Sequence, residues 1–240
     1  MNKTALVTGG ARRLGKYITL ALAENGFDII LHYHSSGDEA EKVRKQILKL
    51  GRKCFLVRAD VGKSAEIKKM FQKMKKHFRQ IDVVINNAAT IERANLEQTT
   101  EQLWDRILSV NLKSVFLISQ EAAKWMRKQN NGMILNIASL GGIQAWKEHL
   151  AYSVSKAGVI HLTKILAKEL APAISVNAIA PGTIEMSDTD NRTKNIKPSS
   201  IPMKRFGKPE EICSLVVFLA TKSRYTTGQV FAIDGGKSIL

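Results

Sequence analysis

The chain has 240 residues, of which 44% are hydrophobic and 24% are charged, and this composition is ordinary for a globular protein with a large core. No apolar run reaches the ~18–20 residues needed to cross a bilayer, and the first residues lack the apolar region of a signal peptide, so we expect a cytoplasmic protein without membrane contact. The net charge of +16 falls largely on residues 42–53 and 63–79. We interpret these segments as amphipathic helices with a solvated basic face, and we expect no nucleic-acid partner because no binding motif accompanies the charge.

Apolar runs and turn residues predict strands and helices that alternate along the chain. Residues 3–8 are expected to form a strand, the glycine-rich segment 9–15 to form a turn, and Leu14 to Asn25 to form a helix. The later expected elements are a strand at 27–33, a helix from Asp38 to Leu50, a strand at 54–59, a helix at 64–78, a strand at 81–86, one long helix from Thr100 to Lys128, a strand at 133–138, a helix that contains Tyr152 and ends near Leu170, a strand at 174–180, a helix at 209–220 and a strand at 229–234.

Strands that are apolar throughout, alternating with helices, indicate a parallel sheet covered on both faces. We therefore expect an α/β fold with one doubly wound domain that spans residues 1–240. The polar segment 183–208 contains two of the five prolines and is too long for a routine connection, so we expect it to be a substrate-binding lid.

Tyr152 and Lys156 are four residues apart, so on a helix their side chains share one face, one turn apart. An ammonium group at that distance favours the phenolate and lowers the phenol pKa from its usual value near ~10, which suits a general acid or base at neutral pH. Ser139 lies thirteen residues before the tyrosine, at the end of an apolar run, where a hydroxyl is placed to hydrogen-bond a substrate oxygen. Taken alone, the pair is equally compatible with a chance spacing on a solvated helix.

A turn that contains Gly9, Gly10 and Gly15 separates the first strand from its helix and, as in dinucleotide sites, offers backbone N–H groups to a phosphate. The G-x-G-x-x-G spacing is absent, so a purely structural turn is the alternative. The next strand ends without the acidic residue that binds the ribose of NAD, and basic or hydroxyl side chains occur instead, so we expect NADPH. These side chains are Arg12, Arg13, His34 and Ser35. His32 and His34 lack nearby metal-ligating partners, and Cys54 and Cys213 are far apart, so we expect no metal.

Several short motifs occur together in an order that resembles the short-chain dehydrogenase/reductase family over essentially the whole chain. They are Thr8–Gly15, Asp60-Val61, Asn86–Ala89, Asn111, Ser139, Tyr152-x-x-x-Lys156 and Pro181-Gly182. Segments 201–212 and 227–236 resemble the 3-oxoacyl-[acyl-carrier-protein] reductase branch of that family. The resemblance implies a Rossmann fold with seven parallel strands in the order 3-2-1-4-5-6-7 and helices on both faces. It also implies NADPH-dependent reduction of a carbonyl to an alcohol, with a 3-oxoacyl group on acyl carrier protein as the substrate in fatty-acid synthesis.

The same resemblance implies a role for each motif residue. Tyr152 would give its proton to the carbonyl oxygen, Lys156 would lower the phenol pKa and bind the nicotinamide ribose, and Ser139 would hold the carbonyl oxygen. Asn111 would keep a water molecule in a proton relay to Lys156. The implied cofactor contacts are Gly9, Arg12, Arg13, Leu14, Gly15, His34, Ser35, Asp60, Val61, Asn87, Ala88, Ala89, Tyr152, Lys156, Pro181, Gly182 and Ile184. The helices at 101–128 and 151–171 would pair with a second subunit, which implies a homotetramer or a dimer.

Three departures from the family pattern keep other readings open. Arg13 replaces a glycine in the turn and, with the segment 32–35, resembles pteridine reductases, although those enzymes often have an aspartate where this chain has Ser139. The segment Asn86–Ala89 ends in alanine in place of glycine, and residues 170–174 lack the base that often grips the acidic carrier, although Lys124, Arg127 and Lys128 could supply one. The alternatives are therefore a pteridine or small-ketone reductase and, as a different class, a non-catalytic dinucleotide-binding subunit.

Overall fold

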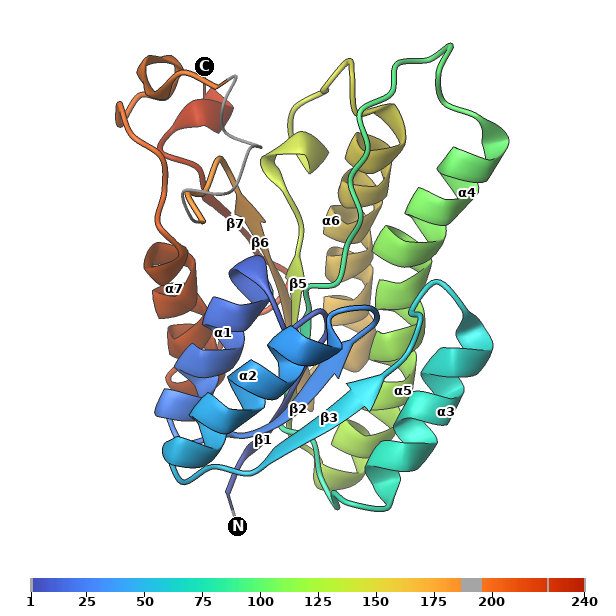
Figure 1. Cartoon of the computed structure of the whole chain (residues 1–240), viewed down its shortest axis with the longest axis vertical. Coiled ribbons are helices and arrows are strands. Elements are labelled where there is room, and N and C mark those ends of the chain that lie inside the picture. Colours follow the sequence, from blue (N-terminus) through green and yellow to red (C-terminus); the bar gives the residue numbers. More distant parts are fainter. Residues whose placement is uncertain (1, 187–195, 224, 240) are drawn as a thin grey trace.

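In the computed structural model, residues 2–186, 196–223 and 225–239 are described, and seven strands form one parallel sheet (Figure 1). The strands are β1 (Thr4–Val7), β2 (Asp28–Tyr33), β3 (Cys54–Arg58), β4 (Val83–Asn86), β5 (Gly132–Ile137), β6 (Ile174–Pro181) and β7 (Val230–Ile233). Their order is β3-β2-β1-β4-β5-β6-β7 and every pair is parallel, which confirms the expected topology. The chain reverses its direction of winding between β1 and β4, and in such sheets ligands bind at that point, outside the carboxyl ends of the strands.

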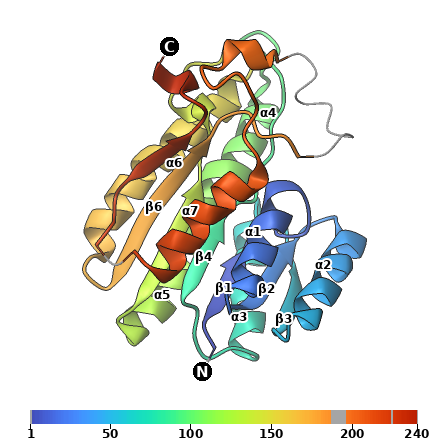
Figure 2. The same ribbon diagram turned by 90° about the vertical axis from the view of Figure 1, so that its left-hand side faces the viewer.

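Helices cover both faces of the sheet (Figures 1 and 2). They are α1 (Arg13–Glu24), α2 (Gly37–Lys49), α3 (Ser64–Lys75), α4 (Glu101–Leu108), α5 (Ser114–Gln129), α6 (Leu150–Leu170) and α7 (Pro209–Thr221). The apolar stripes of α1, α2 and α7 pack with strand residues in one buried cluster, whereas α3, α5 and α6 pack in a second cluster. Because both faces of the sheet are covered, strands β1, β4 and nearly all of β2, β5 and β6 are buried without alternation.

The helix expected from Thr100 to Lys128 is divided into three segments. It starts at Thr100 as expected, and Thr100 caps it, because its hydroxyl accepts a hydrogen bond from the backbone N–H of Leu103 at 3.2 Å. Between α4 and α5, residues Ser109–Lys113 form a π-helical turn. Such a turn inserts one extra residue into the helix and occurs frequently at functional sites. An apolar periodicity of three and four does not reveal it, because the two flanking α-helical segments each keep that periodicity.

One further boundary differs slightly from expectation. Helix α2 begins at Gly37, with Ser36 in the N-cap position, and not at Asp38. Asp38 instead lies in the first turn, where a carboxylate interacts favourably with the helix dipole. Within the expected lid, residues 187–195 lie outside the described residues. The ends of the lid are tied together, since Gly207 donates its N–H to Thr183 at 3.0 Å and Glu185 donates to Gly207 at 2.9 Å. No described helix combines the length and the apolar character that crossing a membrane requires.

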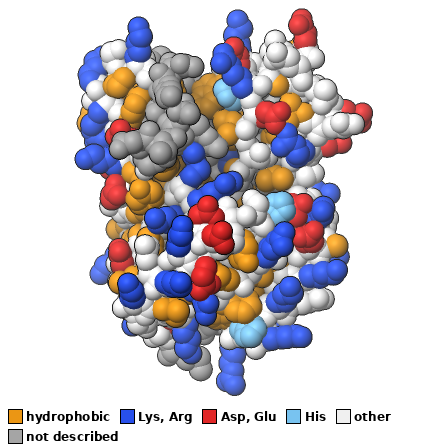
Figure 3. Space-filling view, viewed as in Figure 1, with side chains coloured by type: hydrophobic (Ala, Val, Ile, Leu, Met, Phe, Trp, Pro, Cys, Tyr) orange, Lys and Arg blue, Asp and Glu red, His pale blue; other side chains and the backbone are white. Residues whose placement is uncertain are grey.

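Basic side chains are spread over the surface and interleaved with acidic ones, as Figure 3 shows for one face. A few of them form short-range ion pairs, such as Arg44 with Glu41 and Lys124 with Glu121, three residues apart on their helices. Such exposed pairs are typical of a solvated helix surface. They contribute little to stability.

Candidate active site

A cleft of about 1420 Å³ runs along the carboxyl ends of the strands. All seventeen residues expected to contact a cofactor line this cleft, and so does Ser139. They come from the turns after β1, β2, β3, β4 and β6, from the segment after β5, and from helix α6. Parallel strands bring their carboxyl ends to one edge of the sheet, and this is why motifs far apart in the sequence meet there. Asn111 is the exception, because it is fully buried behind the cleft wall and not part of its lining.

The glycine turn at one end of the cleft permits a close approach of backbone to backbone. Gly9 has a φ of +62°, and a Cβ atom on Gly15 would lie 2.1 Å from the carbonyl oxygen of Gly9, so only glycine fits there. The side chain of Asn87 holds the turn, since its Nδ2 atom donates to the carbonyl oxygens of Thr8 at 2.8 Å and Gly9 at 3.2 Å. The Asn87 amide therefore stabilises the conformation of the glycine turn through two hydrogen bonds to its backbone. The sequence alone did not indicate this role. This bare, tightly held backbone before α1 has the form that fits a dinucleotide phosphate.

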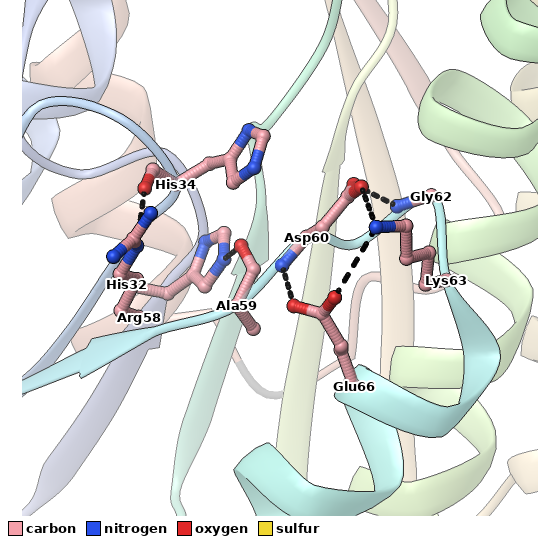
Figure 4. Close-up of polar contacts among 8 residues, drawn as sticks. All are labelled: His32, His34, Arg58, Ala59, Asp60, Gly62, Lys63 and Glu66. Carbon is pink, nitrogen blue, oxygen red and sulfur yellow. Dashed lines mark hydrogen bonds and ion pairs between the residues drawn. The ribbon is translucent and has the colours of Figure 1, made fainter.

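His32 fastens the glycine turn to the end of β3. Its ring is buried at 1% exposure, Nδ1 accepts the N–H of Gly9 at 3.1 Å, and Nε2 lies 3.0 Å from the carbonyl oxygen of Ala59 (Figure 4). Since Nδ1 accepts, Nε2 must carry the proton and donate to Ala59, which requires the neutral ring. Burial lowers the pKa of His32 to about 4, so the ring is neutral at physiological pH. From the sequence, His32 was considered as a metal ligand and as part of the segment 32–35, and its ring was given no structural role; its position directly before the predicted phosphate-binding side chains was the available signal.

Beyond His32, charged groups surround the segment that follows β3 (Figure 4). Asp60 donates its backbone N–H to Glu66 at 2.7 Å, and its carboxylate accepts the N–H of Gly62 at 3.0 Å. Lys63 lies 3.6 Å from carboxylate oxygens of both acids. The Arg58 side chain donates to the backbone carbonyl of His34 at 3.1 Å and supports the turn after β2. This end of the cleft thus has a fixed backbone, with the exposed side chains of Arg12, His34 and Ser35 at its rim.

Lys156 lies at the opposite end of the cleft from these side chains, one turn after Tyr152 on α6. Its Nζ atom is 5.9 Å from the centre of the Tyr152 ring and donates a hydrogen bond to the carbonyl oxygen of Ile137 at 2.7 Å. The lysine is only 3% exposed, and this burial lowers its pKa to about 8. A cation close to a phenol favours transfer of the phenol proton.

Ser139 and Trp146 flank the tyrosine. Ser139 ends the segment after β5, and its hydroxyl accepts the N–H of Gly141 at 3.1 Å. Trp146 stacks on the Tyr152 ring, with 6.3 Å between ring centres and 16° between ring planes. Gly141 leaves room for the indole, since a Cβ atom at that position would lie 2.8 Å from it. Sequence reasoning missed Trp146 because no periodicity or motif marks a loop residue, although a tryptophan between the serine and the tyrosine was itself an available signal.

Asn111 occupies the π-helical turn and holds the cleft wall. Its Oδ1 accepts the N–H of Thr90 at 2.8 Å, and its Nδ2 donates to the carbonyl oxygen of Thr90 at 2.8 Å and to the hydroxyl of Ser155 at 3.1 Å. Ser155 in turn donates to the carbonyl oxygen of Tyr152 at 2.6 Å. Asn111 therefore connects the loop after β4 to the helix of the tyrosine and lysine, and Thr90 and Ser155 were not anticipated as its partners.

A doubly wound sheet with a glycine turn at one end of its cleft and a tyrosine–lysine pair at the other defines the class of nicotinamide-dinucleotide-dependent oxidoreductases. The family profile described as enoyl-(acyl carrier protein) reductase matches residues 9–238. The chain belongs to the short-chain dehydrogenase/reductase family.

Relatives of the chain share its full length. The 3-oxoacyl-[acyl-carrier-protein] reductase FabG of Staphylococcus epidermidis is 40% identical over 241 residues, which cover 98% of this chain and 99% of the relative. FabG of Thermotoga maritima is also 40% identical, with 98% and 97% covered. Among solved structures, acetoin dehydrogenase from Enterobacter cloacae has a TM-score of 0.91 at 34% identity, with 100% of this chain and 96% of that chain covered.

Proposed function

We propose that this protein is an NADPH-dependent reductase of 3-oxoacyl thioesters carried on acyl carrier protein. The single observation that carries the proposed reduction is the Tyr152–Lys156 pair in one cleft with the glycine turn. The thioester substrate is supported by the full-length relatives, whose printed name is 3-oxoacyl-[acyl-carrier-protein] reductase. The chain is an oxidoreductase of the short-chain family, and the choice of substrate within that family is the proposed step.

When bound, the dinucleotide supplies a hydride to the substrate carbonyl carbon. Tyr152 gives its phenolic proton to the carbonyl oxygen, and Ser139 holds that oxygen beside the phenol. Lys156 stabilises the phenolate that remains, because its ammonium group lies 5.9 Å from the ring centre in a buried position. Trp146 covers the tyrosine ring and limits the access of bulk water to the phenol. Asn111 fixes the backbone of Thr90 and, through Ser155, the first turn of α6.

The preference for NADPH over NADH is proposed from the residues at the far end of the cleft. β2 is followed by His34 and Ser35, and no acidic residue occurs between the end of this strand and Asp38, so the position that binds the ribose of NAD lacks a carboxylate. Arg12 lies in the glycine turn and lines the same space, where a guanidinium group binds phosphate oxygens strongly.

Turnover assays distinguish the proposed substrate from the alternative. We expect the protein to oxidise NADPH in the presence of acetoacetyl thioesters, and to do so more slowly with NADH. The alternative is a pteridine reductase, which Arg13 in the turn favours, and this enzyme would oxidise NADPH with a dihydropterin instead. If acetoacetyl thioesters are not reduced, the proposed function is refuted, and if dihydropterin is not reduced either, the alternative is refuted as well.

We also propose that α5 and α6 pair with a second copy of the chain. Three apolar side chains on these helices are exposed: Phe116 at 42%, Val154 at 46% and Ile165 at 49%. Exposed apolar groups on neighbouring helices are typical of subunit interfaces. Light scattering during gel filtration is expected to show a dimer or tetramer, and a monomer at micromolar concentration would contradict this proposal.

A further inference from the structure

The chain leaves the sheet at the end of β2, and backbone hydrogen bonds show where it turns. Successive carbonyl groups of a strand point alternately to its two neighbouring strands. The carbonyl oxygen of His32 accepts the N–H of Gly10 at 3.0 Å, on the side of β1. The carbonyl oxygen of Tyr33 accepts the N–H of Ala59 at 3.1 Å, on the side of β3. If the strand continued, the carbonyl oxygen of His34 would point to the side of β1 again.

The carbonyl group of His34 points instead to the side of β3, where an arginine binds it. Nε of Arg58 donates to this oxygen at 3.1 Å (Figure 4). Arg58 is the last residue of β3 and lies opposite Tyr33 in the parallel register, so its side chain adds one hydrogen bond where the backbone ladder ends. Within the described part of the chain Arg58 forms no ion pair, since the neighbouring carboxylates lie beside Lys63.

The orientation of this peptide group decides where the N–H of Ser35 points. The peptide bonds of this segment are trans, and in a trans peptide the carbonyl oxygen and the N–H point in opposite directions. With the oxygen of His34 directed to β3, the N–H of Ser35 is directed to the side of β1, where the glycine turn carries Arg12. Both Ser35 and Arg12 line the cleft, and this N–H donates to no described residue. Arg58 thus holds a backbone donor toward the space that the Arg12 guanidinium also borders.

We propose that Arg58 sets the preference for NADPH by holding the N–H of Ser35 toward the 2′-phosphate of the cofactor. The inference rests on the proposed function, because it presupposes the preference for NADPH. Arg58 does not line the cleft, so it acts through the peptide group that it binds and is a positioning residue. NADH lacks the 2′-phosphate, so this arrangement contributes to the binding of one cofactor and not of the other.

NADP⁺ and NAD⁺ differ only in the 2′-phosphate and serve as the two probes. Their dissociation constants are measured by titration calorimetry with the full chain. Arg58→Met removes the donor, and we expect about tenfold weaker binding of NADP⁺, the scale of one hydrogen bond to a charged group, with unchanged binding of NAD⁺. Arg52→Met is the matched control and is expected to keep the preference. Arg52 precedes β3 at the end of the strand away from the cleft, and its guanidinium also donates to a backbone carbonyl, that of Gly26 at 3.4 Å.

A double-mutant cycle tests whether Arg58 acts through the N–H of Ser35. Ser35→Pro removes this N–H, and Ser35→Ala is its control because it removes only the hydroxyl group. In the Ser35→Pro background, Arg58→Met is expected to cost little further affinity for NADP⁺, since the donor that it positions is already absent. Additive losses would overturn the proposal. Circular dichroism checks the fold of each variant, and if Ser35→Pro does not fold, the comparison of Arg58→Met with Arg52→Met decides alone.

The ratio of the two dissociation constants separates the inference from the function on which it rests. A preference for NADP⁺ that survives Arg58→Met refutes the role of Arg58 and leaves the proposed function intact. An equal loss for both cofactors refutes it too, because a merely structural role would weaken both. Equal affinity of the unaltered protein for both cofactors refutes the proposed preference for NADPH, and the role of Arg58 with it.

Discussion

Replacing Lys156 by methionine is expected to stabilise the fold while it abolishes activity. The lysine is 3% exposed, and burial lowers its pKa from the ordinary 10.5 to about 8. One pKa unit corresponds to about 1.4 kcal/mol, so holding the ammonium group in this site opposes folding by about 3 kcal/mol at pH 7. Methionine removes this penalty but leaves the carbonyl of Ile137 without the donor at 2.7 Å, which offsets about 1 kcal/mol. We expect a net gain of about 2 kcal/mol in the free energy of unfolding.

The difference in the free energy of unfolding between the Lys156→Met variant and the unaltered protein is expected to decrease as the pH rises. The folded-state pKa lies below the unfolded value, so between about pH 8 and 10.5 the unfolded chain binds the proton that the folded chain has lost. The stability of the unaltered protein therefore rises with pH relative to the methionine variant across that window. The advantage of the variant is expected to shrink by about 2 kcal/mol between pH 7 and pH 9.5.

Urea unfolding of the cofactor-free proteins at these two pH values measures both quantities. Lys164→Met is the matched control, because Lys164 is an exposed lysine on the same helix and its replacement is expected to change the stability little at either pH. A Lys156→Met variant that is less stable than the unaltered protein at pH 7 would refute the reasoning. A difference that does not change with pH would do the same.

Three further substitutions test the site. Tyr152→Phe is expected to lower kcat by at least ~10²-fold while NADPH still binds, as measured by fluorescence titration, and retained turnover would mean that another group supplies the proton. Arg12→Ala is expected to weaken NADPH binding several-fold and leave NADH binding unchanged, so an equal loss for both cofactors would contradict its role at the 2′-phosphate. His32→Leu removes the bonds to Gly9 and Ala59; we expect about tenfold weaker binding of both cofactors, with retained secondary structure by circular dichroism, and unchanged affinity would show that the turn holds without the ring.

The order of elements could be predicted from the sequence because each strand is short and mostly apolar, and each except the last is followed by a helix. The resemblance to the short-chain family then provided the strand order, which the structure confirms. The residues that line the cleft could also be predicted from the sequence, because most of the motifs occur directly after predicted strands. Parallel strands bring their carboxyl ends, and therefore these motifs, to one edge of the sheet. Tyr152 and Lys156 required only the helical spacing of four residues.

Other features depend on contacts between segments that the sequence does not relate. The ring of His32 reaches Gly9 and Ala59 only because β2 lies between β1 and β3 in a particular register. Trp146 covers Tyr152 through a loop conformation that no local pattern specifies. Asn111 was expected to keep a water molecule in a proton relay to Lys156, and this stays a prediction; the bonds of its amide to Thr90 and Ser155 could not be foreseen from the sequence. The partners of these side chains depend on strand register and loop conformation. Their roles therefore cannot be inferred from residue type alone.

The π-helical turn at Ser109–Lys113 accommodates about one residue more than a continuous α-helix would over the same rotation. Because the wider turn absorbs that residue locally, deleting one residue there would restore regular α-helical bonding with little rotation of α5. The faces of Ile118 and Ala122 would stay hidden against the sheet. The change would instead fall on Asn111, whose amide bonds Thr90 and Ser155 from this turn. Relatives aligned with a gap here are therefore expected to keep the position of α5 and to build the wall behind Tyr152 in a different way.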